Sequence, residues 1–139
     1  MNLFRVIYTS QPFGFDQSVL DGILLDARRA NLRDGVTGAL ICRADLYIQL
    51  LEGPEDAVRA TIARIVADDR HLDVVLRVAE TVTERWFGDW AMFHDPAASW
   101  IWTRDDVASG AVDRATEAEV TGFFARLRDA PPSGDTHPA

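Results

Sequence analysis

Apolar and polar positions follow two different periods along this chain, and their order predicts its architecture. Four segments are rich in β-branched and aromatic residues, are short, and are bounded by turn residues, which is typical of strands. They are "LFRVIYTS" (3–10), "VTGALICR" (36–43), "LYIQLLE" (46–52) and "LDVVLRVAETVT" (72–83). The shorter segment "DWAMFH" (89–94) predicts a fifth strand.

Between these strands the apolar period changes to that of a helix. The segment 18–31 carries Val19, Leu20, Ile23, Leu24 and Ala27 on one helical face. We expect this helix to end near Asn31. A second helix is predicted over 54–69, with Pro54 in its first turn and acidic residues beside it that suit the positive helix N-terminus.

The resulting order is βαββαβ plus one strand, which predicts an α+β, ferredoxin-like fold with both helices on one sheet face. The segment "TEAEVTGFFARLRD" (116–129) predicts a further amphipathic helix, with Thr116 and Glu119 as a capping box. We expect this helix to cover the free sheet face or to meet a second copy of the chain. The predicted organisation is a domain over 1–95, a helical cap over 96–130 and a disordered tail over 131–139.

Composition narrows the functional classes. The chain has 139 residues, is 47% hydrophobic and carries a formal net charge of −8, which argues against nucleic acid or an anionic membrane as a partner. Cys42 is the single cysteine, so no internal disulfide can form, and no Cys/His cluster predicts a metal site. The N-terminus does not resemble a signal peptide and no apolar run approaches a membrane span, so we expect a cytoplasmic protein.

The sequence contains no common catalytic motif: GxSxG, HExxH, the P-loop and GxGxxG are all missing. Three polar residues nevertheless stand out. Gln49 interrupts the apolar run "LYIQLLEGP", where an amide without partners costs about 1–3 kcal/mol. Tyr8 lies in the central strand of the predicted sheet, beside the strand of Gln49. If both face the helices, they meet in the groove between them, and Asn31 closes one end.

Ordered motifs make the first 95 residues similar to the BLUF family, the blue-light sensors that use flavin. The motifs are "VIYTS" with Tyr8, "ARRANLRDGVTGALIC" with Asn31, "YIQLLEGP" with Gln49, "ARIVADDRH" and "WFGDWAM" with Trp90 and Met92. The resemblance implies noncovalent binding of FAD, with FMN as the alternative. It also implies a sensor without enzymatic turnover, which passes its signal to a separate, unidentified partner protein; a homodimer is left open.

The resemblance also implies the residues that hold the flavin. The isoalloxazine ring would lie between the two helices. Asn31 would pair with its polar edge. Helix positions suited to the walls of the slot are Ile23, Leu24 and Ile65, although ordinary core positions would look the same. Residues implied near the pyrimidine edge, the ribityl chain or the second helix end are Arg64, Asp68, Arg70 and His71.

Four residues carry the implied photochemistry. Tyr8 would donate an electron and then a proton to the excited flavin, and Gln49 would switch its hydrogen bonds between the phenol and the ring. Trp90 and Met92, on one face of the predicted fifth strand, would change with the signal. One departure from many family members is Ala30, which stands where a second asparagine is common.

Two other functions are compatible with the predicted fold. The first is a photochemically inert interaction module. The second is a small hydrolase of the acylphosphatase kind, which needs an anion-cradling loop after the first strand. The segment "SQPFGFDQ" (10–17) has one glycine, no arginine and an aspartate, which disfavours this second reading.

Overall fold

A computed structural model describes residues 3–12, 17–43, 46–67, 71–88, 93–96 and 102–129. The strands are β1 (Leu3–Pro12), β2 (Thr37–Arg43), β3 (Leu46–Gly53), β4 (His71–Val82) and β5 (Phe93–Pro96). The helices are α1 (Gln17–Asp34), α2 (Glu55–Val66), α3 (Arg104–Ala108) and α4 (Glu117–Asp129). The element order is therefore βαββαβ followed by β5, as the pattern predicts, and then two helices, of which α4 matches the helix predicted over 116–129.

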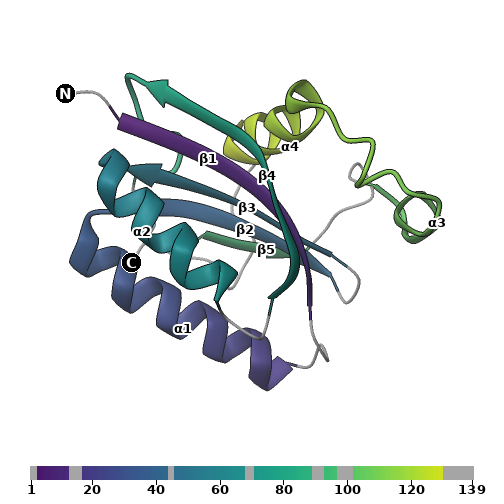
Figure 1. Ribbon diagram of the computed structural model, residues 1–139, viewed down its shortest axis with the longest axis horizontal. Helices are drawn as coiled ribbons and strands as arrows, with labels where there is room; N and C mark the ends of the chain where they lie inside the picture. The colour runs from purple at the N-terminus through teal and green to yellow at the C-terminus, as the bar shows by residue number, and fades with distance from the viewer. Residues whose placement is uncertain are drawn as a thin grey trace.

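The five strands form one sheet in the order β4-β1-β3-β2-β5. Pairs β1–β3, β1–β4 and β2–β3 are antiparallel, whereas β5 runs parallel to β2. Helices α1 and α2 lie side by side on one face of this sheet, and α4 lies on the opposite face (Figure 1). The α+β, ferredoxin-like prediction is confirmed by this arrangement.

Alternation along the strands gives the sheet two separate cores. On the helix side, Tyr8 of β1 packs in a cluster with Ile23 and Leu24 of α1 and Val58 of α2. The next residue of β1, Ile7, faces the other side. Its cluster contains three buried residues of α4, which are Val120, Phe124 and Leu127. Helix α4 therefore covers the sheet face that α1 and α2 leave open.

Helix α1 continues three residues beyond the predicted end at Asn31. It stops at Gly35, whose φ of +73° is a left-handed conformation that glycine adopts without steric penalty. The backbone N–H of Val36 donates to the carbonyl oxygen of Asn31 at 3.0 Å, which is the long hydrogen bond of a Schellman helix end. Asn31 thus lies inside the last turn of α1.

The fifth strand also differs from its prediction over 89–94. Strand β5 is Phe93–Pro96, and its Phe93 and His94 pair with Ala39 and Leu40 of β2. Residues 89–92 lie outside the described residues, so the predicted strand face carrying Trp90 and Met92 is not tested. The segment "HDP" is typical of a turn by composition, but pairing with a buried neighbour strand makes it extended.

Two helix details correct the sequence pattern. The helical period of Val58, Ile62, Ile65 and Val66 predicts these four residues as the buried stripe of α2, but Val66 is 61% exposed while Thr61 is buried. Thr116 accepts a hydrogen bond from the backbone N–H of Glu119, as the capping box predicts. The Glu119 carboxylate, however, accepts a hydrogen bond from the Trp102 indole N–H at 3.1 Å.

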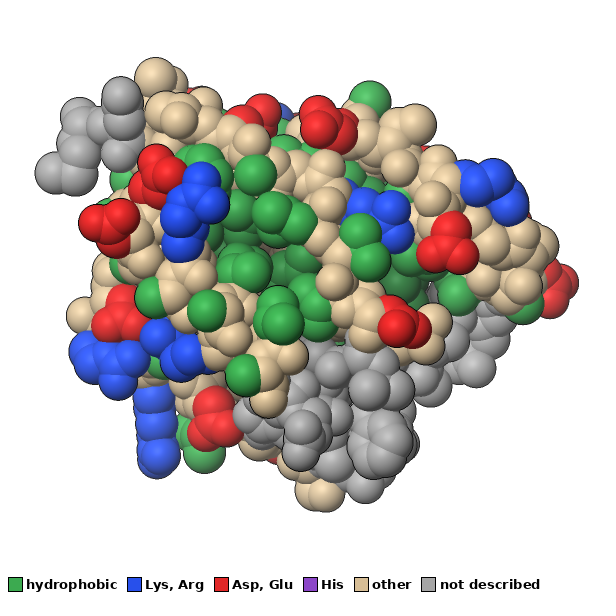
Figure 2. Space-filling view, viewed as in Figure 1, with side chains coloured by type: hydrophobic (Ala, Val, Ile, Leu, Met, Phe, Trp, Pro, Cys, Tyr) green, Lys and Arg blue, Asp and Glu red, His purple; other side chains and the backbone are tan. Residues whose placement is uncertain are grey.

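The surface carries both apolar and charged side chains. Figure 2 shows hydrophobic side chains gathered near the middle of one face, with acidic and basic side chains around them. Large exposed apolar residues include Val75 and Leu76 on β4, one of the two edge strands of the sheet. Among the described residues, no helix combines the length and the apolar character that crossing a membrane requires.

Candidate functional site

Tyr8 and Gln49 are direct neighbours across the pair of central strands. The register of β1 and β3 pairs Tyr8 with Gln49, and both side chains are buried, with 0% and 3% exposure. The Tyr8 hydroxyl donates a hydrogen bond to Oε1 of Gln49. The glutamine that interrupts the apolar run of β3 therefore has the specific polar partner that its burial requires.

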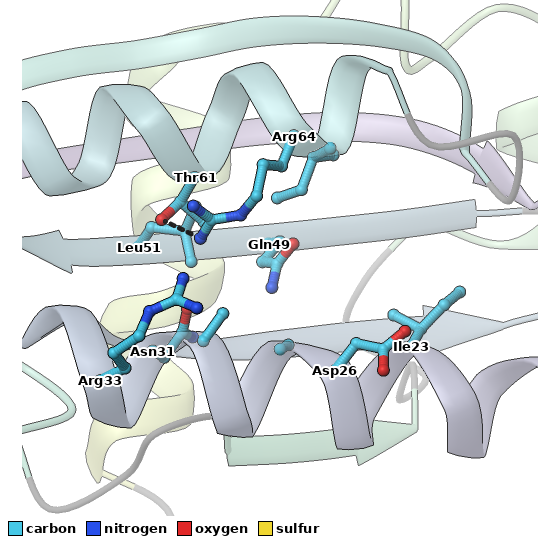
Figure 3. Close-up of a pocket in the computed structure, with 11 residues that line it drawn as sticks. Ile23, Asp26, Asn31, Arg33, Gln49, Leu51, Thr61 and Arg64 are labelled. Carbon is cyan, nitrogen blue, oxygen red and sulfur yellow. Dashed lines mark hydrogen bonds between the residues drawn. The ribbon is translucent and has the colours of Figure 1, made fainter.

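A cavity of about 320 Å³ opens between α1 and α2 above this pair. Gln49 and Leu51 of β3 reach into it from the sheet (Figure 3). The other lining residues come from the two helices: Ile23, Asp26, Ala27, Ala30, Asn31 and Arg33 of α1, and Thr61, Arg64 and Ile65 of α2. Five of these eleven lining residues are apolar and six are polar or charged.

Asn31 enters the cavity from the last turn of α1 and is only 1% exposed. The helix end at Gly35 fixes the direction of this turn, because the Val36 N–H is bonded back to the Asn31 carbonyl. The helical extension beyond Asn31 therefore changes the interpretation of this residue. It is a buried amide of the cavity wall, and the helix is terminated four residues later.

Charged side chains surround one end of the cavity. Arg64 donates to Thr61 Oγ1 at 3.1 Å and to Asp34 Oδ2 at 3.3 Å, which links α2 to the end of α1. Arg33 also donates to Asp34, and this side-chain hydrogen bond holds the pKa of Asp34 below its ordinary value. Figure 3 shows Arg33 and Arg64 extending toward each other from the two helices.

The residues named from the sequence separate into three groups. Those that line the cavity are Ile23, Asn31, Gln49, Arg64 and Ile65. Tyr8 lies in the core and is in contact with Gln49, which lines the cavity. Leu24 is buried in the same core and does not line the cavity. The third group is Asp68, Arg70, Trp90 and Met92, which lie outside the described residues, together with His71, which begins β4 and whose side chain is not described.

Part of the cavity lining is formed by residues outside the predicted site. Ala27 and Ala30 follow Ile23 at spacings of four and seven residues, which places all three on one face of α1. Their helical spacing is the signal in the sequence that places them together on the cavity wall. Ala30, which stands where many family members have a second asparagine, lies in the cavity wall. Thr61 was also missed, because threonine is neutral in an amphipathic pattern.

The residues present fit a flat heteroaromatic ring with a polar edge. Sites for small molecules have volumes of about 300–1,000 Å³ and combine apolar walls with a few polar groups. Each amide, Asn31 and Gln49, offers both an acceptor oxygen and an N–H donor. The pyrimidine edge of a flavin carries carbonyl groups and an N–H, so it needs this mixture of donors and acceptors. Ile23 and Ile65 supply apolar surface on the two facing helices.

Comparison with known families gives one match over most of the chain. Residues 3–93 match the family model described as BLUF, sensors of blue light using FAD. The blue light- and temperature-regulated antirepressor BluF of Escherichia coli K12 is 33% identical over 90 residues, which are 65% of this chain and 22% of that protein. The photoactivated adenylate cyclase subunit beta of Euglena longa is 35% identical over 94 residues, 66% of this chain and 11% of that protein.

Solved structures agree with the fold. The dark-state structure of BlrB, a BLUF protein, superposes with a TM-score of 0.75 at 25% identity, covering 91% of this chain and 96% of that one. The photo-activated state of BlsA superposes with a TM-score of 0.78 at 24% identity, covering 96% and 99%, and supports the fold alone. The chain spans about a fifth or less of the two curated relatives named above. The family match over residues 3–93 shows that the chain belongs to the BLUF family of flavin-based blue-light sensors.

Proposed function

We propose that this chain binds a flavin noncovalently in the cavity between α1 and α2 and uses it to sense blue light. Asn31 and Gln49 would hold the polar edge of the ring, and Ile23 and Ile65 would lie against its faces. The ring and the start of the ribityl chain would fill the cavity, so FAD and FMN are both accommodated. FAD is the proposed flavin, because the family model is defined by it.

Tyr8 is the proposed electron donor. A bound flavin, once excited by blue light, supplies a strong oxidant at the cavity floor. Tyr8 would be the residue that supplies the electron, and its phenolic proton, which becomes strongly acidic on oxidation, would follow it. The hydrogen bond from Tyr8 to Gln49 would be the first step of the path along which that proton leaves, through the amide. Tyr8 would regain both the electron and the proton, so no net reaction would take place.

Gln49 is the proposed switch. Its Oε1 accepts from Tyr8, and its amide N–H₂ remains on the same planar group to face other partners. Rotating or tautomerising that amide reverses which neighbour receives a hydrogen bond, without any covalent change to the backbone. A new donor toward the O4 edge of the ring would stabilise the excited state more than the ground state. Light then shifts the population between two hydrogen-bond arrangements and the absorption band moves slightly to the red.

The other residues of the family motifs have proposed roles in passing on the signal and in holding the flavin. Trp90 and Met92 would report the Gln49 rearrangement to a separate partner protein, which is unidentified. Asp68, Arg70 and His71 would lie near the pyrimidine edge or the ribityl chain. In this proposal the protein catalyses no reaction with turnover. The family match gives no support to the alternative of a small hydrolase of the acylphosphatase kind.

The observation that carries this proposal is the buried hydrogen bond from Tyr8 to Gln49 at the floor of a ring-sized cavity. The test is the light response of the FAD-loaded protein in which Tyr8→Phe removes the hydroxyl. We expect Tyr8→Phe to bind flavin and to lose the normal photocycle. The chain has one other tyrosine, Tyr47, buried on the same strand as Gln49, so Tyr47→Phe is the matched control and should keep the photocycle. A wild-type response in Tyr8→Phe would contradict the donor role.

A further inference from the structure

A second cavity, of about 510 Å³, lies between the sheet and the segment that follows α3. Its lining comes from β1, β3 and β4, from Val107 of α3, and from Gly110, Val112 and Asp113 beyond that helix. Val107 and Val112 pack against the apolar cluster beneath α4, so the cavity adjoins that core. Its described lining residues are all different from those of the cavity between α1 and α2. The second cavity is therefore a separate candidate site.

Arg77 is the extra residue of a β-bulge in the strand that borders this cavity. Ile7 of β1 pairs with Val78 of β4, and Tyr8 pairs with Leu76, which leaves Arg77 without a partner in this ladder. Bulges of this kind re-aim a side chain and are frequent beside functional sites. The bulge brings Arg77 into the lining of the second cavity.

The Arg77 guanidinium has one polar neighbour there. Its Nε donates to Oγ1 of Thr9 at 3.1 Å, and Thr9 is only 1% exposed. Within the described part of the chain no other hydrogen bond of Arg77 is found, so its two Nη groups can serve a ligand. A guanidinium presents these donors as a planar fork that matches a carboxylate. The Arg77 end of the cavity is therefore an anion subsite.

Asp73 provides a carboxylate of the same lining. Its φ of +52° is a left-handed conformation that residues other than glycine seldom adopt, and such outliers gather at functional sites. Thr9 pairs with Val75, so the guanidinium bound to Thr9 lies level with a residue two positions from Asp73. Two residues of strand span at most roughly 7 Å. A small ligand head that carries both charges can bridge this separation.

The charges of the lining favour a ligand with charges of both signs. The described lining contains one guanidinium, Arg77, and two carboxylates, Asp73 and Asp113. A phosphate or a dicarboxylate would meet repulsion from these two carboxylates, and a simple cation would meet the guanidinium. A zwitterion satisfies both subsites. Val107 and Val112 add apolar surface for the rest of the ligand.

We propose that the second cavity binds a free α-amino acid with an apolar side chain. Its carboxylate lies on the Arg77 fork, its ammonium group donates to Asp73, and its side chain packs against Val107 and Val112. Cavities of this size and mixed lining are typical of sites for small molecules. This inference does not depend on flavin binding or on the proposed light response.

The test is isothermal titration calorimetry of the 139-residue chain in darkness, with L-phenylalanine as the probe. The analogue 3-phenylpropionate lacks only the ammonium group, and 2-phenylethylamine lacks only the carboxylate. Arg77→Gln removes the guanidinium. Asp73→Asn removes the negative charge and keeps a residue type that tolerates the left-handed backbone. Arg59→Gln is the control, because Arg59 is exposed on α2 and lines neither cavity.

We expect one phenylalanine to bind per chain and each analogue to bind at least about tenfold more weakly, since each lacks one charge-assisted hydrogen bond. Arg77→Gln and Asp73→Asn should weaken phenylalanine binding by a similar factor, and Arg59→Gln should keep the wild-type affinity. No binding at millimolar phenylalanine would overturn the inference. Equal affinities for phenylalanine and either analogue would overturn it without any variant, and so would wild-type affinity in both Arg77→Gln and Asp73→Asn.

Discussion

The Tyr8 hydroxyl donates to Oε1 of Gln49, which lies directly opposite it on the neighbouring strand. The bond is buried under the cavity, and the strand register fixes both ends, since backbone pairing places the two Cα atoms as partners. A hydrogen bond of this kind contributes only about 1 kcal/mol net to stability. Two arrangements of the amide can therefore differ by a small free energy, as a switch requires.

Replacing Gln49 with leucine should abolish the red shift and keep flavin binding. Leucine has a similar volume and no hydrogen-bonding group, so the cavity floor remains closed while the amide is lost. The measurement is the light-minus-dark difference spectrum of the FAD-loaded variant. The matched change is Leu50→Met, which alters a buried neighbour on the opposite sheet face and should keep the shift. An unchanged shift in Gln49→Leu would remove the amide from the mechanism.

Replacing Asn31 with alanine should mainly weaken flavin binding. The lost hydrogen bonds to a buried polar edge correspond to about 1–3 kcal/mol, or roughly a fivefold to 150-fold rise in Kd. The measurement is a titration of flavin-free protein with FAD, followed by quenching of flavin fluorescence. Leu32→Ala is the control, because Leu32 is the next residue of α1 and is 64% exposed. Equal affinities of Asn31→Ala and wild type would place the ring contact elsewhere.

The buried Arg5–Glu52 ion pair, with a contact of 2.8 Å, should matter far more to stability than an exposed pair of the same geometry. Glu52→Ala leaves the buried Arg5 guanidinium without its buried carboxylate and removes the acceptor of two backbone N–H groups, and should lower the free energy of unfolding by about 3–5 kcal/mol. Glu55→Ala breaks the Arg59–Glu55 pair, which also has a 2.8 Å contact but is exposed on α2. Its expected cost is about 0.5 kcal/mol or less. The measurement is urea unfolding of both variants. Similar unfolding midpoints would contradict the prediction that the buried pair contributes more to stability than the exposed pair.

Gly38 should not tolerate a side chain. A Cβ atom there would lie 2.0 Å from the Leu50 carbonyl oxygen, between β2 and β3 and close to the Gln49 position. Gly38→Ala should cost about 1–3 kcal/mol or more, because the obstacle is backbone. Gly122→Ala has nothing within 4 Å of the new atom and lies inside α4, so it should stabilise by about 0.5–1 kcal/mol. Thermal unfolding of the two variants should therefore shift in opposite directions.

The sequence predicted the parts of the site that follow from strand and helix periodicity. The βαββαβ order places β1 beside β3, which was sufficient to bring Tyr8 and Gln49 together. Burial of Asn31 in the groove between the helices was also predictable, since α1 presents its apolar face to the sheet. These relationships depend on local patterns and on one topological rule, so they can be read without coordinates.

Other features depend on contacts between distant residues. Arg5 and Glu52 are 47 positions apart, and nothing in either local pattern marks them as a buried pair. The strand β5 is extended because it pairs with β2, although its "HDP" segment is typical of a turn. Helix α1 runs past Asn31 because Gly35 can adopt a positive φ, whereas "RDG" by itself fits a stop at several positions.

The most direct measurement of the central claim is the absorption spectrum of wild-type protein loaded with FAD, recorded before and after brief blue light. The account predicts bound flavin whose band moves slightly to the red and returns in darkness, with no loss of flavin from the protein. Protein that cannot be loaded with FAD, or loaded protein whose spectrum is identical before and after illumination, would contradict it.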